Sequence, residues 1–561
     1  MSIYNKLREE RKRLLEFGLI PEWYSTAGWQ LFKERYLYQA NNPREQYERI
    51  ASTLATHTPD PGLYKDKFFQ ILWNGWLSPS TPVLSNIGTT RGLPVSCAGS
   101  YIGDSIDAVY QGLHETAALT KAGFGTASYL GDIRPRGADI SVGGKSSGVL
   151  PVLESYRQAM SYVAQGTARR GSWAGYLPID HGDFMEVCED LNHNPDGNNI
   201  GWCISDEFLV RLEHKDEDAI ARYQMAMTTK MITGKGYFFF PDKANAKRPE
   251  WYVERGLDIK APQLCAEIML HSSDEYTYTC VLSSMNVAKY DEWKDTDAVF
   301  IATIFLDAVC QEFLERGKNI PGLGKAIDFT KKSRALGLGV CGLHTLFQKK
   351  RLVFGEFESV MLNREIFKHL DAESRRASKW LADTWGTPEW MEGHGMANTH
   401  RIAVAPTKST ALIMGGVSEG INPDTAMVYT QRTAGGEVER ISPELLSLLK
   451  EKGLNSRKYI EEVRDAMGSV QNVEWLDDNE KAIFRTAFEI PQMAVLQLAS
   501  QRSEFIDQWQ SLNLFFAAEE QEEYINEVHK AAFKDPNILA LYYVYSRAGV
   551  QASKDECLAC M

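Results

Sequence analysis

The stretch "ALGLGVCGLHTLF" (residues 335–347) is a short apolar run that passes through glycine into a helix-like segment. Three other stretches have the same character: "VSCAGSYIG" (95–103), "GYFFFPD" (236–242) and "RIAVAPTKSTALIMGG" (401–416). Short apolar strands that alternate with helices through Gly-rich turns are typical of α/β domains. We therefore predict an α/β fold for the central part of the chain.

The flanking parts are expected to be helical. Residues 1–80 show helical apolar spacing, for example in "NPREQYERIASTLATH" (42–57). After about residue 440, "SPELLSLLKEKG" offers Ser442 as N-cap, Pro443 at the first helical position and Gly453 as the stop. The expected domains are a helical region (1–80), a catalytic α/β domain with a helical C-terminal part (81–547) and a flexible tail (548–561).

Composition excludes several classes of protein. The 561 residues are 44% hydrophobic and 24% charged, which is typical of a folded globular protein. The net charge of −13, without a long basic run, argues against a nucleic-acid-coating role. No apolar stretch approaches a membrane span of about 18 residues, and the charged N-terminus does not resemble a signal peptide. We expect a cytoplasmic protein without membrane or nucleic-acid partners.

The nine cysteines are too sparse for a disulfide scaffold, and their number is odd. Their neighbouring residues divide them into two groups. One group has apolar or mixed surroundings, and we interpret its members as buried small hydrophobes: Cys188, Cys203, Cys310 and Cys341. The other group has Ser, Pro, Glu, Thr and Gly neighbours, as expected of loops and strand ends: Cys97, Cys265, Cys280, Cys557 and Cys560. The second group is the candidate for chemistry.

The segment "QLCAEIML" (263–270) places Cys265 two residues before Glu267. In an extended strand or a tight loop tip, residues i and i+2 point the same way, so the thiol and the carboxylate could face one substrate. The alternative from these eight residues is a buried cysteine beside an exposed glutamate.

Three further segments have the composition of phosphate-binding or nucleotide-binding loops. "PTKSTALIMGG" (406–416) is a hydroxyl-rich turn that opens a helix-like run, where N–H groups could cradle a phosphate. "GDIRPRGADISVGGKSSG" (131–148) and "AQGTARRGSWAG" (164–175) carry arginines on Gly-rich loops. Capped helices that bind nothing and ordinary solvated loops are the alternatives.

The C-terminus, "ILALYYVYSRAGVQASKDECLACM" (538–561), combines a tyrosine pair with a Cys-x-x-Cys on a polar tail. Core packing is the alternative role for Tyr542 and Tyr543. A zinc site is the alternative for Cys557 and Cys560, and the absence of a second cysteine pair nearby disfavours it.

Taken together and in their order, these motifs resemble the large, catalytic subunit of class I ribonucleotide reductases, from about residue 20 to the end. The resemblance rests on these segments: "STPVLSN…SCAGSYIGDSID", "QGTARRG", "LCAE", "CVLSSMN", "RALGLGVCGLHTLF", "PTKSTALIMGGVSEGINP", "FIDQWQSLNLF" and "LYYVYSR". It implies a ten-stranded α/β barrel of two five-stranded parallel halves, with Cys265 on a loop through its centre. The implied activity is radical-based reduction of ribonucleoside diphosphates to 2′-deoxyribonucleoside diphosphates.

The resemblance also implies a role for each residue that matches a motif. Cys265 matches the transient thiyl radical that takes the 3′-hydrogen, and Glu267 matches the group that removes the 3′-hydroxyl proton. Cys97 and Cys280 match the thiol pair that reduces the 2′-carbon and is left as a disulfide. Substrate contacts are implied for Thr81, Ser96, Gly125, Pro406, Ser409, Thr410 and Arg169. An effector site for deoxynucleoside triphosphates at a dimer interface is implied for Asp104, Ser105, Ile106 and Arg134.

The implied partners explain the C-terminus. No cofactor is expected in this chain, since the radical would come from a metal-containing small subunit and pass through Tyr542 and Tyr543. Cys557 and Cys560 would enter the pocket, reduce its disulfide and be reduced in turn by thioredoxin or glutaredoxin. A second copy of the chain and nucleotides, with ATP and deoxynucleoside triphosphates as effectors, complete the expected partners.

Two features depart from the family pattern. Gln263 stands where the family usually has an asparagine that binds the 2′-hydroxyl. The family's N-terminal ATP-binding regulatory domain has no counterpart in this sequence, because only about 25 residues precede the first matching segment, "GWQLFKERYLYQ" (28–39).

Three other interpretations are less consistent with the sequence. A cobalamin-dependent (class II) reductase would need no small subunit, and the tyrosine pair argues against it. A glycyl-radical reductase lacks its expected C-terminal motifs here. An inactive nucleotide-binding regulator is disfavoured by the presence of all five expected cysteines.

Overall fold

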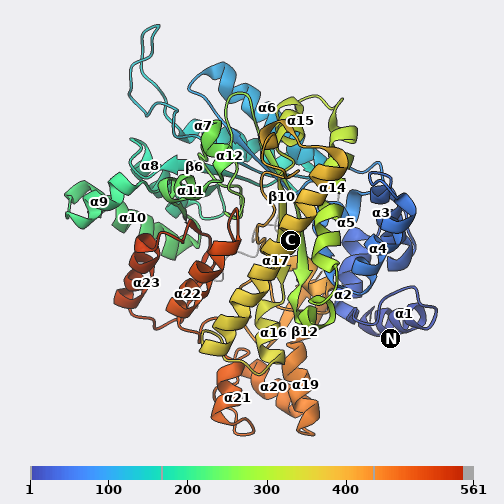
Figure 1. Cartoon of the computed structure of the whole chain (residues 1–561). Helices are drawn as coiled ribbons and strands as arrows, with labels where there is room; N and C mark the ends of the chain where they lie inside the picture. Colours follow the sequence, from blue (N-terminus) through green and yellow to red (C-terminus); the bar gives the residue numbers. More distant parts are fainter. Residues whose placement is uncertain (1–2, 166–168, 434–435, 547–561) are drawn as a thin grey trace.

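The computed structural model describes residues 3–165, 169–433 and 436–546. Its N-terminal region is helical, as expected, with α1 (Ile3–Glu16), α2 (Thr26–Leu31), α3 (Pro43–Ala55) and α4 (Pro61–Trp73). The start of α3 follows from sequence, since the Asn42 side chain accepts a hydrogen bond from Glu45 N and Pro43 occupies the first turn. Figure 1 shows these helices on one side of the molecule, in blue.

The first half of the barrel is a run of five parallel strands. In spatial order these are β2 (Cys97–Tyr101), β3 (Gly125–Tyr129), β6 (Trp173–Pro178), β7 (Asn199–Cys203) and β8 (Tyr237–Phe239). Every residue of these strands except those at a few strand ends is buried, as expected of parallel strands covered on both faces. The predicted five-stranded parallel half is therefore confirmed.

The second half is built on β9 (Tyr278–Asn286) and β10 (Leu336–Cys341), which pair in parallel. β9 is antiparallel to β2, so the two halves meet in opposite directions. β1 (Leu77–Pro79) pairs with β9, although it precedes residue 81, where we expected the barrel to begin. β14 (Ala540–Leu541) pairs with β8 at the other edge.

The largest sheet has nine strands among the described residues, where we expected a barrel of ten. Beyond β10 the backbone pairing continues as single hydrogen bonds and one parallel bridge, between Leu338 N and Arg401 O and between Val404 and Gln510. These segments hold the barrel together without forming regular strands. Three two-stranded sheets lie outside it: β4 (Ala164–Gln165) with β5 (Arg169–Arg170), β11 (Val428–Thr433) with β12 (Gly436–Ile441), and β13 (Leu514–Phe516) with β15 (Val544–Ser546).

Helices surround the sheet in Figure 1. α5 (Thr81–Asn86) precedes β2. The helices between the strands of the first half are α6 (Ile106–Ala122), α7 (Leu150–Tyr162), α8 (Phe184–His193), α9 (Asp206–Glu213) and α10 (Glu217–Thr233). Those between β8 and residue 420 are α11 (Pro241–Lys247), α12 (Glu250–Glu254), α13 (Tyr290–Trp293), α14 (Ala298–Gly317), α15 (Gly324–Ser333), α16 (Leu343–Lys349), α17 (Phe357–Trp385) and α18 (Lys408–Ile413). Near the C-terminus lie α22 (Gln492–Arg502) and α23 (Glu522–Lys534).

A smaller lobe carries α19 (Pro443–Glu451), α20 (Arg457–Asp465) and α21 (Asp478–Ile483), at the bottom of Figure 1. It has its own apolar cluster, which includes Leu445, Leu449 and Phe484. The expected helix signals are confirmed here: Ser442 Oγ accepts from Leu445 N, and Gly453 takes a left-handed φ of 71° after the helix.

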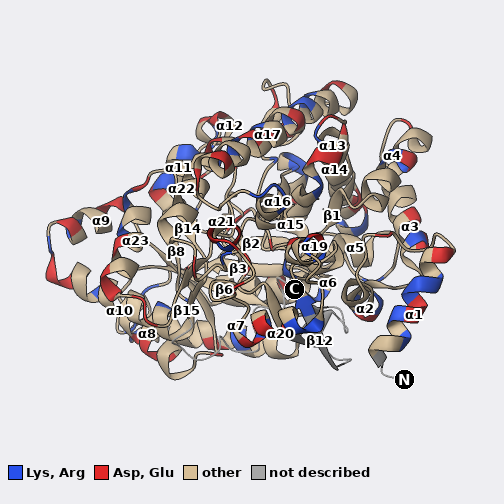
Figure 2. Cartoon of the chain, turned by 90° about the horizontal axis from the view of Figure 1, so that it is seen from below, with Lys and Arg blue, Asp and Glu red and all other residues tan. Residues whose placement is uncertain are grey.

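Acidic and basic residues are interspersed along the outer helices in Figure 2. Among the residues that the structure describes, no helix is long and apolar enough to cross a membrane.

Candidate active site

The loop that carries Cys265 passes between the two halves of the barrel. From the first half, the Tyr176 hydroxyl of β6 donates to Gln263 O (2.9 Å). From the second half, Trp509 N donates to Glu267 O (2.9 Å) and Ser511 Oγ donates to Cys265 O (2.7 Å). The loop turns sharply, since Ala266 N bonds back to Gln263 O and Ala266 has a φ of 65°. Such a conformation is costly for alanine and is typical of functional loops.

Cys97 and Cys280 lie directly opposite each other on β2 and β9. Opposed residues of antiparallel strands have Cα atoms about 4.5–5.5 Å apart, which is within the range that a disulfide spans. The side chains of both cysteines are at most 7% exposed. Cys280 is the third residue of a nine-residue strand, so our expectation of a loop or strand end was wrong for it.

Gln263 connects this pair of cysteines with Cys265. Its Nε2 donates to Cys97 Sγ (3.6 Å), and its Oε1 accepts from the backbone N of Cys265. The side chain is fully buried. One amide therefore touches both the thiol on β2 and the backbone of the central loop.

Glu267 is almost completely buried, with 1% of its surface exposed. Burial raises its pKa from 4.5 to about 7, against the opposing hydrogen bonds from its own backbone, Ser511 and Gln263. Ser511 Oγ lies 3.0 Å from Glu267 Oε2 as well as 2.7 Å from Cys265 O. A hydroxyl has one proton and cannot donate fully to both oxygens, so a protonated Glu267 would satisfy this triad better than a carboxylate. A carboxyl with a pKa near 7 can exchange protons at neutral pH.

Sequence reasoning missed two polar residues of this site, Gln508 and Ser511. Gln508 Nε2 donates to Cys280 Sγ (3.5 Å), and its Oε1 accepts from Met269 N (3.1 Å). Both residues lie in "FIDQWQSLNLF", which we used for the resemblance without assigning roles. The signal was available, because buried polar residues in an apolar run need partners.

The tyrosine pair lies where the chain crosses from one sheet to another. Tyr542 and Tyr543 follow β14 and precede β15. Their ring centroids are 4.2 Å apart. Tyr237 of β8 completes the cluster, and sequence reasoning did not single it out. Its ring centroid lies 4.7 Å from that of Tyr542 and 5.3 Å from that of Tyr543.

The predicted substrate residues are spread over three segments. Ser96 Oγ donates to Ser80 Oγ (2.9 Å) and precedes Cys97, while Gly125 pairs with Cys97 in the register of β2 and β3. Thr81 opens α5 and lies 3.3 Å from the Tyr36 hydroxyl. The turn that Pro406 begins leads into α18, which contains the buried Ser409 and Thr410.

The predicted effector residues meet at the start of α6. Asp104 pairs with Arg134, with Oδ2 2.6 Å from Nε, and Ser105 Oγ caps the helix by accepting from Ala108 N. Ile106 is 77% exposed and Tyr110, one turn further, is 67% exposed. Three predicted positions cannot be placed: the Arg169 side chain, Cys557 and Cys560 lie outside what the structure describes.

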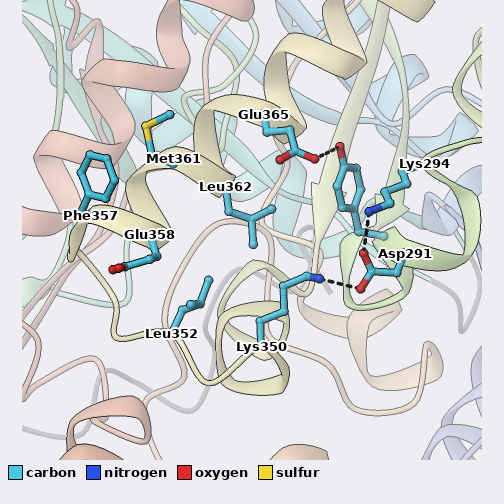
Figure 3. A pocket seen from close by; sticks show the side chains of 10 residues that line it. Asp291, Lys294, Lys350, Leu352, Phe357, Glu358, Met361, Leu362 and Glu365 are labelled. Carbon is cyan, nitrogen blue, oxygen red and sulfur yellow. Dashed lines mark hydrogen bonds and ion pairs between the residues drawn. The ribbon is translucent and has the colours of Figure 1, made fainter.

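A surface hollow of about 330 Å³ lies away from these residues (Figure 3). α13, the segment before α17 and the first turns of α17 supply its lining, and none of the predicted site residues lines it. Asp291 pairs there with Lys350 (2.6 Å) and Lys294 (3.1 Å). Among the described residues no group of three or more His, Cys, Asp or Glu side chains could hold a metal ion.

Comparison with known proteins identifies two family regions. "Ribonucleotide reductase, all-alpha domain" matches residues 22–92, and "Ribonucleotide reductase, barrel domain" matches 95–220, 213–394 and 389–544.

Among curated relatives, the "Putative ribonucleoside-diphosphate reductase large subunit" of Frog virus 3 (isolate Goorha) is 31% identical over 87% of this chain and 90% of its own. The "Ribonucleoside-diphosphate reductase large subunit" of Invertebrate iridescent virus 3 is 26% identical over 93% of this chain and 94% of its own.

A solved structure, the "Actinobacillus ureae class Id ribonucleotide reductase alpha subunit", matches with a TM-score of 0.87 and 36% identity. The match covers 96% of this chain and 99% of that one. By its two domains, its relatives and its fold, this chain belongs to the family of ribonucleotide reductase large subunits.

Proposed function

We propose that this chain reduces ribonucleoside diphosphates to 2′-deoxyribonucleoside diphosphates, with Cys265 as the radical thiol and Cys97 and Cys280 as the reductant. The observation that carries the proposal is the register of β2 and β9, which sets the two cysteines opposite each other beside the Cys265 loop. The Gln263 amide between Cys97 and Cys265 supports the assignment of all three to one site.

The reaction balances with the groups of this site. The Cys265 thiyl takes hydrogen from C3′, which forms an S–H bond and breaks a C–H bond. Glu267 accepts the 3′-hydroxyl proton, a task that its pKa of about 7 suits. The 2′-oxygen leaves as water, and the Cys97 and Cys280 thiols supply two electrons and two protons as they form a disulfide. Cys265 then returns its hydrogen to C3′ and is again a thiyl, while Glu267 returns the proton to the 3′-oxygen.

The radical is proposed to arrive from a separate small subunit through Tyr543 and Tyr542. The distance of 4.2 Å between their ring centroids supports radical transfer between these two residues. The solved relative is named a class Id alpha subunit, and the curated relatives are named large subunits, which supports a two-subunit enzyme over the cobalamin-dependent alternative. Cys557 and Cys560 would restore the thiol pair, with thioredoxin or glutaredoxin as their reductant.

Nucleotide binding is proposed at two places. The turn at Pro406–Thr410, with Thr81, Ser96 and Gly125 near Cys97, would hold the substrate, together with Arg169. Asp104, Ser105, Ile106 and Arg134 would bind a deoxynucleoside triphosphate effector. The exposed apolar side chains of Ile106 and Tyr110 support a dimer interface along α6, which a second copy would cover. The cytoplasm is the expected location.

The test is reduction of a ribonucleoside diphosphate by the purified chain with and without a class I small subunit. We expect turnover only with the small subunit, and none from Cys265→Ser, because a serine O–H bond is too strong to form the radical. Turnover of the lone chain with adenosylcobalamin would establish the class II alternative. Turnover by Cys265→Ser would overturn the radical assignment.

A further inference from the structure

Lys230, near the end of α10, is a fully buried lysine beside the tyrosine cluster. Its Nζ donates to Tyr542 O (2.7 Å) and to Gly236 O (3.1 Å), and lies 4.8 Å from the centre of the Phe238 ring. Among the described residues it forms no ion pair with a carboxylate. A buried amine without a counterion is costly, so this arrangement calls for a reason.

The reason follows from the course of the backbone at the tyrosine pair. β14 pairs with β8 up to Leu541, and β15 pairs with β13 from Val544 onward, so residues 542–543 belong to neither ladder. Tyr542 N is satisfied by Leu512 O, whereas the Tyr542 carbonyl is turned toward Lys230. A buried carbonyl needs a donor, and the lysine supplies one from an element 312 residues away in sequence.

The same lysine also fixes the neighbour of the pair. Gly236 directly precedes Tyr237, the first residue of β8, whose ring contacts both Tyr542 and Tyr543. One amine therefore ties together the two backbone segments that carry the three rings. The ladder between β14 and β8 ends at Leu541, so loss of this tie would let residues 542–543 move relative to the start of β8.

We propose that Lys230 is a positioning residue for radical transfer, which holds the Tyr542 backbone against the start of β8 and so keeps the tyrosine rings in contact. This inference rests on the proposed relay through Tyr542 and Tyr543. Displacement of a reacting group by about 1 Å commonly costs about 10²-fold in rate. Burial also lowers the Lys230 pKa from 10.5 to about 7.

Lys243 provides a matched control on the adjacent helix, α11. It is also buried, and its Nζ donates to Ala532 O (3.0 Å) and Asp535 O (2.8 Å) at the end of α23. It anchors the same C-terminal segment but upstream of the tyrosines. Lys230→Met and Lys243→Met each replace a buried lysine by the same uncharged side chain. Only the first removes the contact with Tyr542.

The test uses the full chain with 3-fluorotyrosine at position 542, observed by ¹⁹F NMR, and turnover of the unlabelled variants with the small subunit. We expect Lys230→Met to shift or split the ¹⁹F signal and to lower turnover about 10²-fold with unchanged nucleotide binding. Lys243→Met should leave the signal in place. Lys230→Gln, which keeps two N–H donors, should recover part of both properties.

Separate outcomes judge the inference and the relay. A wild-type ¹⁹F signal in Lys230→Met, or wild-type turnover by that variant, would overturn the positioning role. If Lys230→Met does not fold, an unchanged signal together with full turnover in Lys230→Leu, which also lacks a donor, would overturn it instead. Full turnover by Tyr542→Phe would refute the relay and leave the NMR result as a test of Lys230 alone.

Discussion

Glu267 is the proposed proton acceptor, so its protonation is expected to couple activity to pH. Because its pKa is raised to about 7, we expect turnover to rise with pH through a midpoint near 7 as the proton acceptor becomes available. The measurement is the pH profile of nucleotide reduction under substrate saturation. Glu267→Gln should lose most activity and this pH limb with it; a variant that keeps both would show that another group accepts the proton.

The same residue makes a prediction about stability. Below about pH 4.5 the carboxyl is protonated in the folded and unfolded chains, so the full contribution of its raised pKa to the free energy of unfolding is present. Between about 4.5 and 7 only the folded chain keeps the proton, and the free energy of unfolding should fall as pH rises, by an amount on the order of 3 kcal/mol. Urea unfolding of the wild type and Glu267→Gln across this range measures the difference. If the free energy of unfolding changed equally with pH in the two proteins, this prediction would be contradicted.

Gln263 is the residue that departs from the family pattern, and its amide contacts both Cys97 and the Cys265 backbone. We expect Gln263→Ala to lower turnover by about 10- to 1000-fold, as for the loss of one hydrogen bond in a transition state. Gln263→Asn keeps the amide on a shorter side chain and should retain much of the activity. Single-turnover rates with bound substrate separate this effect from binding. An unchanged rate in the alanine variant would mean that the amide serves structure alone.

At the scale of elements, β10 packs so closely against Cys280 that it requires a glycine. A Cβ at Gly337 would lie 3.0 Å from Cys280 Sγ and 2.3 Å from Leu282 Cδ2. Gly337→Ala should therefore displace β9 at the reductant cysteine and cost about 1–3 kcal/mol of stability, as overpacking does. The thermal unfolding temperature and the turnover rate should both decrease. Gly324→Ala, where a Cβ meets nothing within 4 Å, is the matched control, and equal behaviour of the two variants would count against this packing argument.

At the scale of the whole molecule, catalysis needs a return path for electrons to the buried cysteines. Cys97 and Cys280 are at most 7% exposed, so a reductase protein cannot reach them directly. Cys557→Ser with Cys560→Ser should stop after about one turnover per active site with thioredoxin, because the tail can no longer exchange disulfides. Dithiothreitol, small enough to enter, should restore turnover. Sustained thioredoxin-driven turnover by the double variant would remove this role for the tail.

Effector control is also a property of the whole molecule. The family regions matched in this chain are the all-alpha domain (22–92) and the barrel domain (95–220, 213–394 and 389–544), and the predicted effector residues lie in the barrel domain. Deoxynucleoside triphosphates should change which base is reduced, while a dATP titration should not abolish all four activities. Loss of every activity together would reveal an inhibitory site within the chain.

Much of this protein was determined by local sequence. Helix limits followed from side chains that satisfy the first N–H groups, as at Asn42 and Ser442. Buried parallel strands followed from apolar runs between glycines, and the resemblance depended on short motifs in a fixed order. These signals are readable because the groups that interact lie within a few residues of one another.

Tertiary structure alone decided which distant residues meet. Nothing local shows that Cys97 faces Cys280 across 183 positions (97 to 280), that Ser511 contacts Cys265 and Glu267, or that Lys230 satisfies Tyr542. The second half of the barrel was also less regular than expected, since segments near Val404 and Gln510 form a bridge without a full ladder. Register and burial depend on how the whole chain covers its apolar faces and pairs its buried polar groups, and a short sequence window contains only one of the two partners of such a contact.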